Sequence, residues 1–158
     1  MHLSLRVLAA SVALGLGVAA AQPALADVPG PHPEYVHALS DLRYAHWLLH
    51  FPAEWNVTEH ERDATAHVDR AFADIRQAGF DDGKDVFAEM PVDAGLSHRD
   101  RLQRALASLE RAHADINGRE SDPYARGPRG AADGELDAAI AQVHIALHDQ
   151  FRDRTMGY

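Results

Sequence analysis

The stretch "ALSDLRYAH" (residues 38–46) occurs a second time as "ALASLERAH" (residues 105–113). In each copy the apolar residues are three or four positions apart, which is the spacing of one face of an α-helix. The similarity extends to a second segment, because "VDRAFADIRQA" (68–78) matches "LDAAIAQVHIA" (136–146) at nearly the same offset. A near-constant offset over two helical segments indicates a tandem duplication of a helical hairpin.

Capping and breaking residues predict the ends of four helices. Thr58 and Glu61 form an S/T-x-x-E capping box, and Ser97 with Asp100 resembles a second one. Pro52 is expected to end the first helix, since proline cannot continue it. No sustained alternation of apolar and polar residues predicts a strand. The expected helices cover about residues 34–50, 59–80, 98–117 and 131–151.

The sequence therefore predicts an all-α fold, an antiparallel four-helix bundle built from a duplicated αα-hairpin. Each hairpin has one apolar stripe, and packing the two stripes against each other buries both. Repeat one covers about residues 34–83, a linker covers 84–96, and repeat two covers about 97–151, within a bundle of 34–158. In an up-down-up-down order, the first and third helices are diagonal and parallel, related by a two-fold axis along the bundle.

The first 26 residues resemble a secretory signal peptide. Arg6 gives a basic start, residues 7–21 form an apolar run too short to span a bilayer, and small residues precede a cleavage site between Ala26 and Asp27. Residues 27–33, rich in proline, are expected to form an extended leader. The mature chain is expected in the periplasm or outside the cell, with no membrane association after cleavage.

Composition excludes several classes of function. The chain of 158 residues has no cysteine, which excludes disulfides, thiolate metal sites and covalent c-type haem. Its formal net charge of −9 at pH 7 argues against nucleic acid and anionic membranes as partners. No nucleophile–base pattern, phosphate-binding loop or HExxH motif is present, so the sequence predicts a protein that is not an enzyme.

Histidine is abundant, with eleven in the chain, and two of them occupy the same position of the repeat. His46 and His113 both lie on the apolar seam of their helices, so in the expected bundle they face each other across the interior. Counting back along the second and fourth helices brings His67 and Glu135 to the same level. Imidazole and carboxylate together suit zinc, copper, nickel or iron. Two opposed histidines could instead hold a b-type haem.

The alternative for these histidines is structural, since a buried imidazole often donates to a carbonyl or carboxylate and specifies packing. Secondary surface candidates come from two i,i+4 pairs: His50, which pairs with His46, and the pair of His144 and His148. Asp69 and Asp137 recur in both repeats. They are either exposed charges near helix starts or carboxylates that orient a histidine.

Two functions follow as hypotheses. The first is an exported binding protein that takes a transition metal (Zn, Cu or Ni), or haem, through the core histidines. The second is a non-catalytic protein-interaction or envelope-stress module without a cofactor, whose acidic surface and aromatic residues Trp47 and Trp55 meet a protein partner.

The segment "HPEYVHALSDLRYAHWLLHF" (32–51), with "DDGKD" (81–85), "DPYARG" (122–127) and "LDAAIAQV" (136–143), resembles a group of small exported bacterial helical proteins. The resemblance covers most of the mature chain and implies export and an all-helical fold. The group has no assigned function, so the resemblance implies no catalytic or binding residues.

Overall fold

A computed structural model describes residues 33–50, 58–78, 84–118 and 122–156. These residues form four helices and no strand, which confirms the predicted all-α class: α1 (Pro33–Leu49), α2 (Glu59–Gln77), α3 (His98–Ile116) and α4 (Arg126–Met156). The predicted signal peptide, and the leader up to residue 32, lie outside the described residues. Within the described part of the chain, no helix combines the length and the apolar character that crossing a membrane requires.

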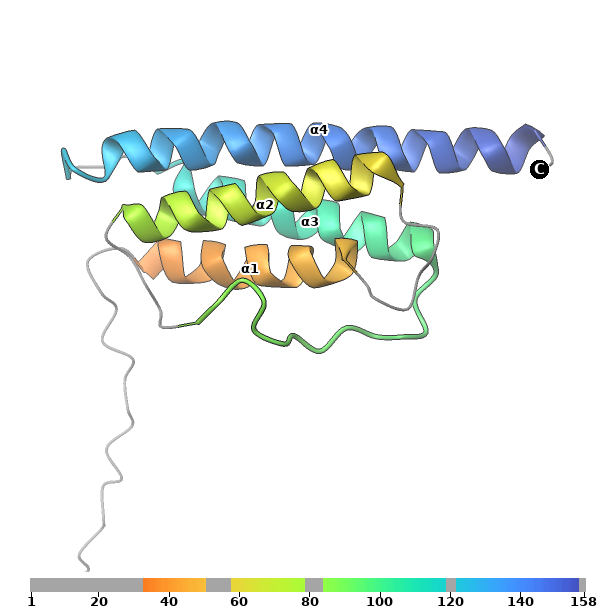
Figure 1. The fold of residues 1–158 in the computed structure, drawn as a ribbon, viewed down its shortest axis with the longest axis horizontal. Coiled ribbons are helices and arrows are strands. Elements are labelled where there is room, and N and C mark those ends of the chain that lie inside the picture. Colours follow the sequence, from red (N-terminus) through yellow and green to blue (C-terminus); the bar gives the residue numbers. More distant parts are fainter. Residues whose placement is uncertain (1–32, 51–57, 79–83, 119–121, 157–158) are drawn as a thin grey trace, which may run out of the picture.

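The helices pack side by side, and their order around the axis differs from the expectation. α1 contacts α2 and α3, and α4 contacts the same two helices, whereas α1 does not contact α4 and α2 does not contact α3 at the backbone level. α1 and α4 run in one direction, and α2 and α3 run in the other (Figure 1). The prediction that α1 and α3 are diagonal and parallel is therefore wrong: they are neighbours with opposite directions.

The linker between the second and third helices is the reason. Residues 84–97 run along the outside of α1 from one end of the molecule to the other (Figure 1). α3 therefore begins at the same end as α2, rather than at the end where α2 finishes. A short turn would have produced the expected up-down-up-down order, but this segment is long enough to return the chain over the whole length of a helix.

Alanines at seven-residue spacing bring the four helices close together. Seven residues are almost two helical turns, so alanines with this spacing lie on one face. Their small side chains leave little between neighbouring backbones, while larger apolar residues fill the remaining core. The completely buried alanines of the helices are Ala38, Ala45, Ala64, Ala71, Ala105, Ala112, Ala132, Ala139 and Ala146.

Local hydrogen bonds form where the sequence predicts helix starts. The Thr58 hydroxyl accepts from the Glu61 backbone N–H, and the Glu61 carboxylate accepts from the Thr58 backbone N–H, which completes the predicted capping box. The Ser97 hydroxyl accepts from the Asp100 backbone N–H at the start of α3. Both residues before the helices have extended backbone, as an N-cap requires.

The fourth helix begins earlier than predicted, at residue 126 instead of 131, and ends later, at 156 instead of 151. The glycines and the proline of this segment suggested a turn. Pro128, however, lies in the first turn of α4, where backbone N–H groups have no helical acceptor and a missing one costs little. Arg129 donates to the carbonyl oxygens of Ile116 and Gly118, so the first turn of α4 caps the end of α3.

Substitution of a buried alanine by leucine tests the close packing. Ala71→Leu should lower the free energy of unfolding by about 1–3 kcal/mol, because the extra methylene groups force neighbouring helices apart. Ala73 lies exposed on the same helix, and Ala73→Leu should change stability by no more than about 0.5 kcal/mol. Urea unfolding of the two variants measures both values, and equal effects would contradict the packing described here.

Candidate functional site

Histidine–carboxylate pairs connect the helices, both in the interior and at partly exposed positions. His46, near the end of α1, is 2% exposed. Its Nδ1 donates to Asp69 Oδ1 of α2 over 2.8 Å. The imidazole ring also lies edge-on to the ring of Phe87, with 5.0 Å between centroids. His46 therefore fastens α1 to α2 and supports part of the linker.

The equivalent residues of the second repeat form a similar pair. His113 Nε2 of α3 lies 3.0 Å from Asp133 Oδ1 and 3.4 Å from Asp137 Oδ1, both on α4. Asp69 and Asp137, which recur in the sequence, thus both lie beside the recurring histidine. Asp133 has no counterpart among the sequence candidates, and it lies one turn before Asp137 on α4.

His67 of α2 and Glu135 of α4 meet directly, with 2.6 Å between Nδ1 and Oε2. Arg70 lies beside both: its Nε donates to Glu135 over 2.9 Å, and its Nη2 is 2.7 Å from His67 Nδ1. A protonated Nδ1 donates to Glu135, and an unprotonated Nδ1 accepts from Arg70. The guanidinium occupies the place beside the carboxylate that a bound cation would need.

The carboxylates around this contact influence one another. Burial alone would raise the pKa of Glu135, but hydrogen bonds from His67 and Arg70 and their charges outweigh it and lower that pKa. Asp74 has the opposite shift, because burial and then the charge of Glu135 raise its pKa against the effect of Arg70.

The four predicted metal ligands do not form one group, and this corrects the sequence-based expectation. His67 and Glu135 meet, but His46 and His113 pair separately with aspartates. Among the residues that the structure describes, no three or more His, Cys, Asp or Glu side chains are placed to hold a metal ion.

The direction of α3 explains the separation of the two histidines. Arg111 of α3 donates to Asp41 of α1, which places these two residues opposite each other in the helix pair. Residue 46 then lies opposite residue 106, because the helices run in opposite directions. His113 is seven residues further along α3, which is about 10 Å along the helix axis. The expected opposition of the two imidazoles needed parallel, diagonal helices.

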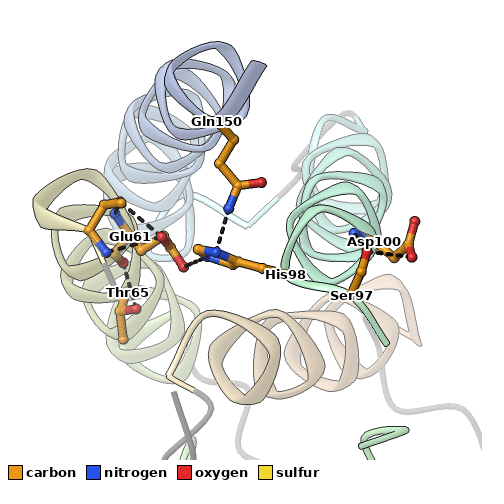
Figure 2. A network of polar contacts seen from close by, with 7 residues as sticks. Glu61, Thr65, Ser97, His98, Asp100 and Gln150 are labelled. Atoms are coloured by element: carbon orange, nitrogen blue, oxygen red, sulfur yellow. Dashed lines mark hydrogen bonds and ion pairs between the residues drawn. The ribbon is translucent and has the colours of Figure 1, made fainter. Parts of the chain in front are cut away.

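A second network, which the sequence analysis missed, joins three helices at one end of the bundle (Figure 2). Glu61 of α2 is 1% exposed, and its Oε2 accepts from His98 Nε2 of α3 over 2.7 Å. Gln150 of α4 contacts the other ring nitrogen, His98 Nδ1. Glu61 and His98 thus connect two helices whose backbones do not touch.

Every acceptor atom of the Glu61 carboxylate is used. Oε1 accepts from the backbone N–H and the hydroxyl of Thr58, and Oε2 accepts from His98. Burial would raise the pKa of Glu61, but the hydrogen bonds from His98 and Thr58 and the charge of His98 outweigh it and lower that pKa. Glu61 is therefore held as a carboxylate in the interior.

The amide of Gln150 can serve either charge state of the imidazole. In the orientation drawn in Figure 2, the Gln150 amide nitrogen faces His98 Nδ1, which suits a neutral imidazole, and Gln150 Oε1 is buried without a hydrogen-bond partner. A half-turn of the amide brings Oε1 to the same place, where it accepts the second N–H of a protonated imidazole. The sequence does carry a signal for this network, because Glu61 and His98 both fall on the apolar stripes of their helices.

Four other histidines are partly or fully exposed. His60 of α2 contacts α4, with its Nδ1 donating to Gln142 Oε1 over 2.7 Å and its Nε2 3.8 Å from Asp149 Oδ2. His50, His144 and His148 are exposed. The His50 ring is 5.6 Å from that of His46, and His148 Nδ1 is 3.7 Å from Asp149 of its own helix.

No family model, no curated protein and no solved structure matches this chain.

Removal of the His98 imidazole tests the buried network. His98→Leu should lower the free energy of unfolding by about 1–3 kcal/mol, because Glu61 keeps only Thr58 as a partner. The pKa of Glu61 should rise, since burial is no longer outweighed. Urea unfolding and an NMR titration of the Glu61 carboxyl carbon measure these two effects. His144→Leu, an exposed substitution on α4, is the control, and an unchanged Glu61 titration in His98→Leu would contradict the network.

Proposed function

We propose that this chain is an exported, non-catalytic envelope-stress module whose helices remain joined in mildly acidic surroundings. The observation that carries the proposal is the number of interhelical histidine–carboxylate contacts. Of the nine histidines in the described residues, five lie within 4.0 Å of a carboxylate on another helix. They connect α1 with α2, α2 with α4, α3 with α4, and α2 with α3 across the diagonal.

Histidine is the side chain whose charge changes most readily between pH 5 and 8. A neutral imidazole contributes an ordinary hydrogen bond to each pair. A protonated imidazole beside an ionised carboxylate forms a charge-assisted hydrogen bond, which is roughly twice as strong. Each pair can therefore join two helices in either charge state of the imidazole, as long as the carboxylate stays charged. An exported protein experiences the pH of the cell's surroundings, so this property has a use in the predicted location.

The lowered pKa values of Glu61 and Glu135 extend the range in which both partners are charged. A carboxyl group whose pKa is lower in the folded state stabilises the fold above its unfolded pKa, which is 4.5 for glutamate. This contribution is lost as the pH falls below 4.5 and through the lowered folded value. Both carboxylates thus stay ionised in mild acid.

Two aspartates have raised instead of lowered pKa values, and this shift favours the folded state as the pH falls. Burial raises the pKa of Asp74 and of Asp115, so each of them costs stability while it is ionised. The cost disappears as the pH falls through the raised value, which is above the ordinary 3.8. A fall in pH therefore removes the cost of ionised Asp74 and Asp115, whereas it removes the stabilising contribution of ionised Glu61 and Glu135.

We also propose that the antiparallel arrangement arose by duplication of a helical hairpin, as the repeat predicts. The contacts His46–Asp69 and His113–Asp137 join equivalent positions within each hairpin. The contact between His67 and Glu135 joins one position of the repeat to its own counterpart. Such a contact is expected where a two-fold axis passes between two copies, here perpendicular to the helices rather than along them.

The metal-binding hypothesis has no comparable support in the described residues. Each of the four predicted ligands has a protein partner: an aspartate for His46 and for His113, and each other for His67 and Glu135. Elemental analysis of the purified protein tests this hypothesis separately from the acid response.

A comparison of pH profiles tests the proposed function. Glu61→Gln keeps the size of the side chain but removes its charge, so wild type should be more stable than this variant above pH 4.5. The difference should shrink as the pH falls through the lowered pKa of Glu61. Melting temperatures between pH 3 and 7 measure it. Glu110→Gln, at an exposed position of α3, should show no such dependence, and a gap that stays constant down to pH 3 would refute the proposal.

Export has its own test. Expression of the full chain in a bacterial host should place the protein in the periplasmic fraction, and mass spectrometry should find Asp27 as its first residue. Full-length protein in the cytoplasmic fraction, with Met1 or His2 at its start, would contradict the predicted signal peptide. The melting temperatures would still test the acid response separately.

A further inference from the structure

Part of the linker is fixed against α1 although it has no regular secondary structure. Val86 is buried in the core, and the Trp47 indole N–H donates to the carbonyl oxygen of Ala88 over 2.9 Å. The Ala88 backbone N–H donates to the Asp85 carbonyl oxygen, which closes a turn around these residues. Residues 85–88 are thus held at both ends of a short loop.

Phe87 is at the centre of this loop, and it is 62% exposed. One side of its ring lies against the buried imidazole of His46, which Asp69 holds in place. A single exposed aromatic residue is common on protein surfaces. Phe87 differs because its backbone is anchored on both sides and its ring has a fixed neighbour. Little conformational entropy remains to be lost when another molecule covers it.

The charges around Phe87 are mostly negative. Asp85 and Glu89, two residues before and after Phe87, are both exposed, and so is Asp93 further along the linker. Lys84 is the one basic residue between 84 and 96. The surface therefore combines a rigid aromatic ring with acidic side chains on either side of it, in a chain whose net charge is −9.

We infer that Phe87, with Asp85 and Glu89, forms a docking surface for a protein partner that has an apolar pocket rimmed by lysine or arginine. The pocket receives the phenyl ring, and the basic rim pairs with the two carboxylates. An anionic membrane does not fit, because the acidic residues would be repelled from it. The surface adjoins the His46–Asp69 pair but makes its docking contacts through Phe87, Asp85 and Glu89, so partner binding and the acid response are tested by different variants.

Photo-crosslinking tests the surface. The full chain is made with a benzophenone amino acid at position 87, and in parallel at position 124, where Tyr124 is 90% exposed and serves as the matched control. Each is irradiated in envelope extract of the source organism. We expect one protein to crosslink at position 87 and not at 124. That protein is identified by mass spectrometry, purified and titrated by calorimetry.

Binding to the purified partner should weaken at least tenfold in Phe87→Ala and less than twofold in Tyr124→Ala. Glu89→Lys keeps the ring and should weaken binding while reducing its dependence on salt, because it reverses one charge at the rim. This variant keeps the test decisive if Phe87→Ala disturbs the linker. Equal crosslinking at both positions, crosslinks only between two copies of the chain, or a partner whose affinity ignores Phe87 and Glu89 would overturn the inference.

Discussion

Close packing of alanine faces is the constraint on which the rest of this structure depends. Buried alanines at seven-residue spacing allow neighbouring helices to approach closely, so the interior of the bundle is narrow. In a narrow bundle the side chains of diagonal helices can reach each other, which is why Glu61 and His98 meet although α2 and α3 do not touch. A wider core of large side chains would leave that buried carboxylate without its partner.

The sequence was sufficient to predict the four helices, but not to predict which helices lie next to each other. Capping residues such as Thr58 and Ser97 predict helix starts because they act within one turn of the chain. The order of helices around the axis depends instead on the path of residues 84–97, and an apolar stripe fits a neighbour on either side equally well. The fourth helix was shortened in the prediction because Pro128 suggests a turn, whereas its effect depends on which turn of the helix it occupies.

For the histidines too, the sequence indicates which residue types recur, but it does not indicate where they lie in the bundle. The repeat marks His46, His113, Asp69 and Asp137 as recurring residues, and in the structure each histidine has its aspartate nearby. The predicted meeting of the two imidazoles required knowledge of helix direction, which the repeat does not contain. In the observed arrangement each of the two imidazoles lies beside an aspartate of a neighbouring helix instead of facing the other imidazole.

The contact between His67 and Glu135 has a further consequence under the proposed duplication. In an ancestral dimer of identical hairpins, the residue at this position would have faced its own copy across the symmetry axis, and two glutamates there would have repelled each other. Once both copies belonged to one chain, they were free to diverge into complementary halves. A base on one copy and an acid on the other now favour pairing between unlike hairpins over pairing between two like ones.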